Sequence, residues 1–532
     1  MLAPHYHSTT TSVRQTYSRL LGPNELAYFL PSRASGLNDI YTRVIFRGPA
    51  ALVSPFRLRI VWAIVRIQHA LLAARVDMPP GRYNEARFVY SPPASPQEAL
   101  EEAGHSLSIH DDKTGLELDH NFLFGDRLLS SSCLSRMFVV RSSEDPMSGL
   151  TEFHMAFCSL HAITDGTSAN IYTILQFLGG SAEPGGNVRS DEELFHILEF
   201  EWSRRWGKAS AADSFEAITP AAESRLPNPT SPFQIAAWRV DSMNLQRRAI
   251  GGHSFPRVPA QTTEQALLEI KFTPQQTLAL VSKCASEGCN LGHAIFALCN
   301  LAWLQTALSR GPEFLAKYAP PTLPTLLYTA ITLRRHLAPV EPLTSPMALA
   351  LGYGTIALPG FLPSGDMKKA FWLRARNAQK QMRRQIKSPM LLPRAQIMAI
   401  ERGRKAKLFA KMDDEGVPVP GSASGLPPNA HNASPPPSLA LMGISHLGDL
   451  GSSYQPELYP ALEFVDSVGH SRKAPGGILL FTRVAAGQRF SMMLGWDRKA
   501  FPEGLVEEFW GRVLKGVEEF GLLEDMEVSA RL

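Results

Sequence analysis

The chain has 532 residues, of which 44% are hydrophobic and 19% are charged, a composition ordinary for a globular protein. Such a length exceeds what one hydrophobic core normally serves, so we expect two domains. The formal net charge of +4 argues against a chain built for nucleic-acid binding or for general attraction to membranes. Five cysteines are too few for a disulfide framework, and none has the His/Cys spacing of a metal site, so we expect reduced thiols and no bound metal.

The two ends of the chain bear on its location. Residues 1–14 are polar and lack the apolar run of a signal peptide, and no stretch reaches 18 uninterrupted apolar residues. These features favour a soluble, cytoplasmic protein. The last three residues, Ala530-Arg531-Leu532, are a permissive form of a peroxisomal address, so peroxisomal delivery is the alternative.

Strands and helices mix in the first half, residues 1–206. Short runs rich in β-branched and aromatic residues predict strands, and longer runs with helical periodicity predict helices. The expected strands cover 39–47, 86–90, 135–141 and 151–160, and the expected helices cover 55–76, 96–104, 168–178 and 191–206. Periodicity is then lost over 207–262 while Pro, Ser and Asn accumulate, which indicates a crossing between two domains.

The second half, residues 263–532, repeats this mixture. The expected strands cover 265–272, 325–333, 352–358, 439–445, 477–484 and 490–496, and the expected helices cover 274–287, 293–309, 367–386 and 503–520. Residues 413–437 are rich in Pro, Gly and Ser and predict a mobile surface insertion. The fold class expected from both halves is α+β, in two domains.

One segment at a strand-to-helix corner can carry chemistry. A hydrophobic strand ends at His161, Asp165 follows four residues later, and Gly166 comes next. A histidine that acts as a base near neutral pH must present an uncharged nitrogen. Asp165 is close enough to brace the turn by hydrogen bonds, and Gly166 allows a backbone geometry or a close approach that a side chain would block. A purely structural histidine gives the same local pattern, so the wider context decides.

That context is a family resemblance. The segment from His161 to Gly166 resembles the His-x-x-x-Asp-Gly signature of chloramphenicol acetyltransferase-like proteins, a superfamily that includes BAHD acyltransferases, peptide condensation domains and fungal trichothecene O-acetyltransferases. Thr332-Leu333-Arg334 resembles the family's Asn-x-Arg element with Thr in place of Asn, and Ser445-His446-Leu447-Gly448 resembles its Ser-Asn-x-Gly strand with His in place of Asn. The order and spacing of these sequence elements match the family pattern from about residue 20 to residue 520, and the sequence as a whole is most similar to the trichothecene enzymes.

The resemblance implies a fold and a reaction. It implies two chloramphenicol acetyltransferase-like mixed-sheet domains with a tunnel between them, in which His161 is the general base. Asp165 would be structural and would pair with Arg334, while Ser445 or Thr332 would help to hold the oxyanion. The expected reaction moves an acyl group, here acetyl, from acyl-CoA to a hydroxyl of a terpenoid or polyketide alcohol. No bound cofactor and no macromolecular partner is implied, and we expect a monomer.

Two departures from the family pattern narrow the function. Leu160 stands where condensation domains carry the first His of a double-His motif, which argues against amide formation on carrier proteins. The Asp-Phe-Gly-Trp-Gly element of BAHD enzymes is absent. Two alternatives therefore stay open: a condensation-like fold recruited for cyclisation or another non-acyl step, and a non-catalytic ligand-binding module.

Positive charge is concentrated in one part of the second half. Residues 366–411 contain fourteen Lys or Arg against two acidic residues, a local charge of +12, whereas the remainder of the chain sums to −8. Such a field suits the phosphates of CoA, and Arg383, Arg384 and Lys407 are the candidate contacts. A solvated basic helix face is the alternative interpretation. The few aromatic residues of this segment do not alternate with the charges as nucleic-acid stacking requires, which disfavours nucleic acid, and a membrane surface is likewise disfavoured.

Overall fold

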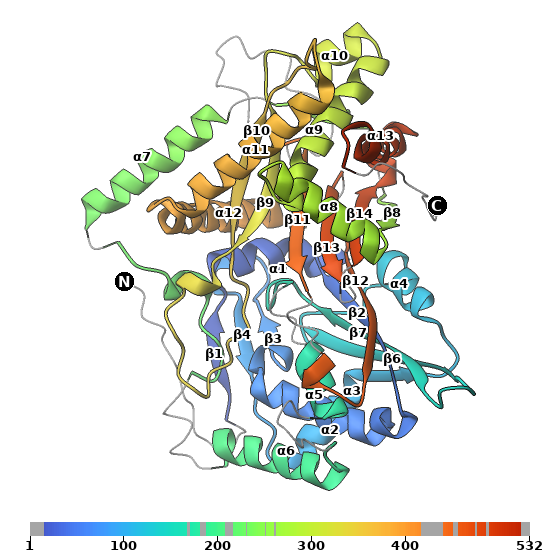
Figure 1. Cartoon of the computed structure of the whole chain (residues 1–532). Helices are drawn as coiled ribbons and strands as arrows, with labels where there is room; N and C mark the ends of the chain where they lie inside the picture. Colours follow the sequence, from blue (N-terminus) through green and yellow to red (C-terminus); the bar gives the residue numbers. More distant parts are fainter. Residues whose placement is uncertain are drawn as a thin grey trace.

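A computed structural model gives the structure of residues 15–166, 171–180, 188–207, 216–229, 231–249, 252–259, 262–416, 440–450, 456–473, 476–485 and 489–522. The described chain forms three β-sheets with helices around them, so the fold class is α+β as expected. In Figure 1 the first half of the chain occupies the lower part of the molecule and most of the second half the upper part.

The first half is built on a five-stranded mixed sheet. Its strands lie in the order β12 (Glu463–Ser471), β2 (Ile40–Gly48), β7 (Thr151–Ser159), β6 (Ser135–Glu144) and β5 (Leu107–His110). All neighbours pair antiparallel except β5 and β6, which are parallel. A small second sheet has the order β1 (Tyr17–Leu20), β4 (Arg87–Tyr90) and β3 (Arg75–Asp77).

The described residues of this half form six α-helices: α1 (Pro23–Ser35), α2 (Pro55–Gln68), α3 (Pro96–His105), α4 (Gly115–Phe124), α5 (Ile171–Gly179) and α6 (Asp191–Trp206). The helix expected over 55–76 is too long, because α2 ends at Gln68 and the chain then enters β3. His69 leaves helical geometry there and its Nδ1 hydrogen-bonds Ser345 Oγ at 2.7 Å, a contact from the other half of the chain. This tertiary contact and the pairing of β3 with β4 outweigh the local helical pattern.

The second half is built on a six-stranded sheet with the order β10 (Leu351–Leu358), β9 (Thr325–Thr332), β11 (Met442–Asp449), β13 (Ile478–Ala485), β14 (Arg489–Asp497) and β8 (Gln265–Lys271). Strand β11 runs parallel to both of its neighbours, and the other pairs are antiparallel. The helices of this half are α7 (Pro232–Arg248), α8 (Pro274–Ser286), α9 (Leu291–Ser309), α10 (Pro312–Tyr318), α11 (Met367–Ile386), α12 (Leu391–Asp414) and α13 (Leu505–Glu519).

Helix α9 is the central helix of the second core. It packs between α11 and α13 on one face of the six-stranded sheet. Its length and apolar composition would allow it to cross a membrane, but 83% of its most apolar 18-residue window is buried inside the protein. A helix covered on nearly all sides by its own protein is apolar all round for that reason, so α9 is a core helix.

Two segments of the second half cross into the first. Strand β12 pairs with β2 through eight residue pairs and forms the edge of the first sheet, and α12 packs against α1, as both views show. The first hydrophobic core accordingly includes Ala406, Ala410, Tyr459 and Leu462 next to residues such as Trp62. The division of the chain into domains at residues 206 and 263 stays a prediction. The strands of the five-stranded sheet come from both sides of that division.

Several elements were not expected from the sequence. Helices α1, α4 and α10 and strands β1, β5 and β12 lie where no element was predicted, β3 replaces the end of the helix expected over 55–76, and α12 follows the predicted basic helix α11 after a short break. Helix α7 lies inside the stretch 207–262 that was interpreted as a crossing without periodicity; most of its residues are exposed, which explains the missing apolar stripe. Helix α12 also includes Asp413 and Asp414 of the predicted insertion, and residues 417–439 lie outside the described residues.

Candidate functional site

His161 lies two residues beyond the end of β7, in the turn that leads towards α5. Its ring Nδ1 is 2.9 Å from the carbonyl oxygen of Thr164. A carbonyl only accepts hydrogen bonds, so Nδ1 carries the ring proton and Nε2 is left with a free lone pair. The turn therefore fixes both the orientation of the imidazole and the tautomer that a general base needs. Residues 167–170, which follow Gly166, lie outside the described residues.

The electrostatic environment keeps this imidazole uncharged. The pKa of His161 lies below its ordinary value, chiefly because burial disfavours the charged ring. The charge of Arg402 lowers the pKa further, whereas Asp165 and the hydrogen bond to Thr164 raise it. The lowering effects are larger in sum, and the neutral, proton-accepting form is favoured at neutral pH.

Asp165 points away from the imidazole turn into an ion pair. Its side chain is 1% exposed, and one carboxylate oxygen, Oδ2, accepts hydrogen bonds from Arg334 Nη2 at 2.9 Å and from the backbone N–H of Ala350 at 3.0 Å. Arg334 also donates to the carbonyls of Pro346 and Ala348. The structure thus brings together the Asp–Arg pair implied by the sequence resemblance, and it joins the His161 turn to the second half of the chain.

A glycine at position 166 is explained by the close approach of a neighbouring side chain. Its φ is not positive, so the turn does not need the conformational freedom of glycine there. A Cβ at this position would lie 2.8 Å from Cδ2 of Leu447, at the end of β11. Of the two explanations offered by the sequence, the structure supports contact with Leu447 and not an unusual backbone.

Thr332 and Ser445 lie on the face of the six-stranded sheet opposite α9. Successive side chains of a strand point to opposite faces, so Thr332 shares a face with Tyr328 on β9, and Ser445 shares it with Gly443 on β11. Gly443 and Tyr328 are paired, and a Cβ on Gly443 would lie 2.5 Å from the Tyr328 ring. Thr332 Oγ1 accepts the backbone N–H of Arg334 at 3.5 Å. The suggested oxyanion role of Thr332 and Ser445 stays a prediction.

His446 points to the other face of β11, towards α9. Its Nδ1 is 2.8 Å from Thr482 Oγ1, and a Cβ on Gly292 at the start of α9 would lie 3.0 Å from its ring. Close by, the pKa of His293 is lowered to about 4 by burial and by the charges of His446 and Arg383. His446, which replaces the family asparagine, therefore points from β11 towards a positively charged part of α11.

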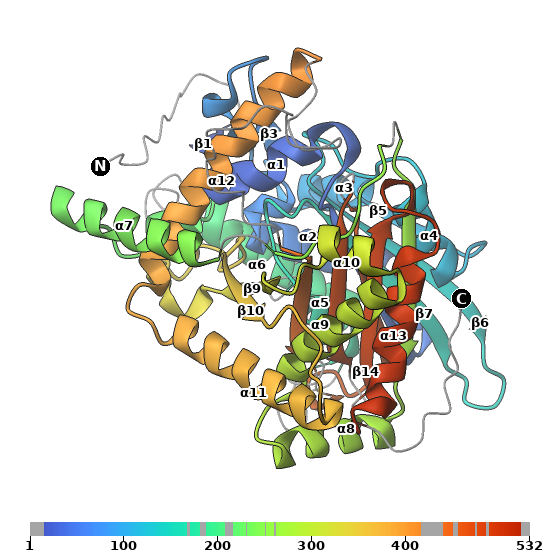
Figure 2. The same ribbon diagram turned by 90° about the horizontal axis from the view of Figure 1, so that it is seen from above.

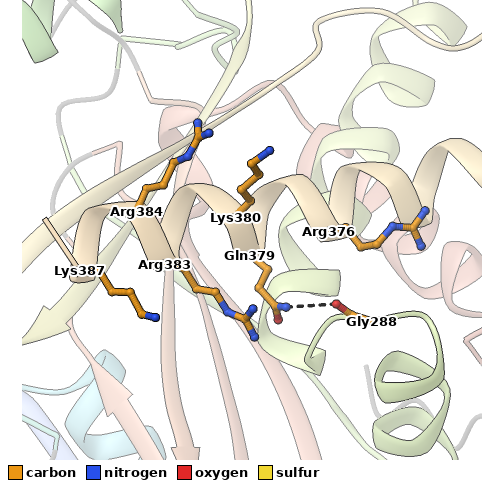
Figure 3. Close-up of a pocket in the computed structure, with 7 residues that line it drawn as sticks. All are labelled: Gly288, Arg376, Gln379, Lys380, Arg383, Arg384 and Lys387. Atoms are coloured by element: carbon orange, nitrogen blue, oxygen red, sulfur yellow. Dashed lines mark hydrogen bonds between the residues drawn. The ribbon is translucent and has the colours of Figure 1, made fainter.

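That part of α11 lines an open cavity of about 550 Å³ (Figure 3). Its lining residues are Gly288, Arg376, Gln379, Lys380, Arg383, Arg384 and Lys387. Arg383 and Lys387 extend from the same side of the helix as Gln379, whereas Lys380 and Arg384 extend from the opposite side in this view. Gln379 fixes the facing loop, since it donates to the carbonyl of Gly288 at 3.1 Å and accepts the N–H of Asn290 at 3.0 Å. We call this cavity the α11 groove.

The three predicted CoA contacts separate in space. Arg383 and Arg384 both line the α11 groove. Lys407 lies on α12, where its Nζ donates to Asn84 Oδ1 at 2.6 Å in the first half of the chain. The basic run over 366–411 is thus one charged segment in sequence but two separate surfaces in space, and Lys407 is not part of the groove.

Three residues near His161 were missed from the sequence: Tyr28 on α1, Tyr353 on β10 and Arg402 on α12. The ring of Tyr28 stacks on His161 with 4.1 Å between centroids. A signal for α12 was present in its small residues Ala399, Gly403, Ala406 and Ala410, which recur at helical spacing and are buried. A Cβ on Gly403 would lie 2.7 Å from the carbonyl oxygen of Pro23, so this glycine lets α12 approach α1 closely.

Comparisons with known proteins support the fold. The TRI3 trichothecene 15-O-acetyltransferase from Fusarium sporotrichioides superposes with a TM-score of 0.67 at 14% identity, covering 98% of each chain. The condensation domain of the monacolin K polyketide synthase MokA gives 0.55 at 11% identity, over 95% of this chain and 98% of that one. The cyclization-docking bidomain of EpoB from Sorangium cellulosum gives 0.52 at 11% identity, over 95% and 85%.

No family model and no curated protein sequence matches the chain. At these low identities the structural neighbours establish the fold alone. The protein has the chloramphenicol acetyltransferase-like fold shared by acetyltransferases and condensation domains.

Proposed function

We propose that the protein is an acyl-CoA-dependent O-acyltransferase that moves an acyl group, acetyl in the simplest case, to a hydroxyl of a secondary metabolite such as a terpenoid or polyketide. The observation that carries this proposal is the geometry of His161: Nδ1 is anchored to the Thr164 carbonyl, and burial favours the neutral ring with Nε2 as proton acceptor. The activity for which the TRI3 neighbour is named, acetyl transfer to an oxygen, agrees with it.

In the proposed reaction His161 moves one proton twice. Nε2 takes the proton of the acceptor hydroxyl while that oxygen attacks the thioester carbonyl carbon. The tetrahedral oxyanion then collapses, the C–S bond breaks, and the imidazolium returns the proton to the leaving thiolate. The products are an ester and free CoA. Thr332 and Ser445, which share one face of the sheet, are the proposed donors to the oxyanion.

The α11 groove is the proposed contact for the CoA phosphates. Arg376, Lys380, Arg383, Arg384 and Lys387 supply five cations around one cavity. Arg383 also acts on the pKa of His293, which neighbours His446 on β11, and Leu447 of the same strand lies against Gly166. We propose that the pantetheine arm extends along β11 from the groove to the His161 turn.

The acceptor would enter along the face of the sheet opposite α9. Tyr328 on this face is 40% exposed, although burial raises its pKa. We propose that the surface beside Tyr328 and the groove are the two mouths of the expected tunnel. The proposed enzyme works as a monomer on small molecules, without nucleic acid or membrane and without a bound cofactor.

The test is an incubation of the purified protein with acetyl-CoA and a panel of terpenoid and polyketide alcohols. The release of free thiol and the mass of an acylated alcohol are measured together, with His161→Ala as the inactive control. Acyl transfer by wild type and its loss in the control support the proposal. Conversion of a panel member without thiol release would favour a recruited non-acyl reaction, and binding without conversion would favour a ligand-binding module.

A further inference from the structure

The imidazole of His161 is covered by an aromatic and cationic cluster that comes from three separate elements. Tyr28 on α1 stacks on the imidazole, with ring centroids 4.1 Å apart and an interplanar angle of 30°. The hydroxyl of Tyr28 is hydrogen-bonded to the hydroxyl of Tyr353 on β10. The guanidinium carbon of Arg402 on α12 lies 4.9 Å from the Tyr28 ring centroid and 4.3 Å from that of Tyr353.

The guanidinium of Arg402 is held without a carboxylate among the described residues. Nη1 of Arg402 donates to Oδ1 of Asn24, and the amide nitrogen of Asn24 donates to the carbonyl of Leu351 at 3.2 Å. Asn24 is 4% exposed, so this support is rigid. Because no carboxylate among the described residues pairs with Arg402, its positive charge acts on His161 and lowers the pKa of that ring.

We propose that Tyr28, Tyr353 and Arg402 form a positioning clamp for His161. The Tyr28 ring fixes the plane of the imidazole, the hydroxyl contact with Tyr353 fixes the Tyr28 ring, and the guanidinium disfavours a second positive charge beside it. The clamp deepens the proposed function, because an unprotonated and oriented Nε2 is what the base step requires.

The charges around the imidazole make the clamp testable. On its own turn His161 faces Asp165, whose negative charge is shared with Arg334. From α12 it faces Arg402, and from α1 and β10 it faces uncharged tyrosines. Removing Arg402 therefore leaves Asp165 as the remaining charge acting on the ring, and the pKa of His161 should rise.

The experiment is a pH titration of His161 in the full chain, followed by NMR of the labelled imidazole, with no turnover required. Arg402→Met should raise the midpoint by about 0.5 to 1 pH unit. Arg402→Lys keeps the charge and should leave the midpoint near that of wild type. The matched control is Arg404→Met on the same helix, because Arg404 is exposed and its guanidinium pairs with Glu401.

A second pair of variants separates the ring from the hydroxyl. Tyr28→Phe keeps the stacked ring and should change kcat less than about 3-fold, whereas Tyr28→Leu removes it and should lower kcat by about 10-fold or more at unchanged KM for acyl-CoA. A folded Arg402→Met protein with an unmoved midpoint, or an equal shift in Arg404→Met, overturns the clamp. A shifted midpoint in a protein that acylates nothing supports the clamp and refutes the proposed function, so the two failures are distinguishable.

Discussion

At the His161 turn the polar side chains are held by partners within the protein, whereas along the α11 groove the cations project into solvent. Asp165 is 1% exposed and joins Arg334 and Ala350, and His161 is fixed by Thr164 and Tyr28. The groove residues Lys380, Arg383, Arg384 and Lys387 are exposed and make no ion pair within the described part of the chain.

This difference separates two kinds of function. A proton transfer needs one group in one geometry, so its surroundings are buried, specific and difficult to substitute. Attraction of a polyphosphate needs a field, which several exposed cations supply jointly and which salt screens. Substitutions of the polar side chains His161 and Asp165 should therefore have large effects, and those of the groove cations should act in small, additive steps.

The largest expected effect is that of His161→Ala on turnover. Loss of the general base should lower kcat by about 10³-fold, with the unfolding transition unchanged within error. In wild type the pKa of His161 lies below its ordinary value, so activity should persist below pH 6.5 and fall as the pH drops through the lowered pKa, where the base becomes protonated. Steady-state kinetics against pH and thermal unfolding measure the two parts. Wild-type turnover in a folded His161→Ala protein would rule out His161 as the base.

Asp165→Ala should act first on stability. Removing this carboxylate leaves the Arg334 guanidinium and the buried N–H of Ala350 without their acceptor, at a cost of about 3 kcal/mol. Denaturant unfolding measures the loss, with Asp145→Ala as the control, because Asp145 is an exposed aspartate in a turn of the first half. An Asp165→Ala protein as stable as wild type would show that the pair contributes nothing net.

Charge removal in the groove should have an intermediate effect. The double substitution Arg383→Ala with Lys387→Ala removes two cations from one side of α11 and should raise KM for acyl-CoA by about 10-fold at similar kcat. The wild-type KM should rise with salt concentration and the variant KM should rise less. Lys407→Ala, on the separate surface of α12, is the matched control. A KM change in the control alone would move the donor site from α11 to α12.

The sequence predicted the parts of this molecule that local patterns encode. Periodicity and capping predicted the β7–His161–Asp165 corner, helices α6 and α11, and most strands of the six-stranded sheet. The motif resemblance predicted the Asp165–Arg334 pair. Tyr28, Tyr353 and Arg402 meet only because α12 crosses to α1 and β10 lies beside both. The spacing of residues within a single sequence does not reveal such a tertiary contact.

Two of the missed elements, β12 and α12, share a physical cause. Strand β12 leaves its own half to pair with β2, and α12 packs through small residues, so neither shows the strong apolar stripe by which strands and helices are recognised. The same limit explains Lys407: charge along the chain locates a basic segment, but the break between α11 and α12 sends its two parts to different surfaces.

The smallest expected effect tests what Gly166 contributes. Because a Cβ there meets the flexible end of Leu447 at 2.8 Å and the glycine has no positive φ, Gly166→Ala should cost about 1 kcal/mol and only a few-fold in kcat. The strain should vanish when Leu447→Ala is added, so the two substitutions should be non-additive in unfolding free energy. Additive losses would mean that the backbone of the turn, and not the contact with β11, requires a glycine. Non-additivity would instead tie the His161 turn directly to the strand along which the pantetheine arm is proposed to extend, and so link the buried site to the exposed groove.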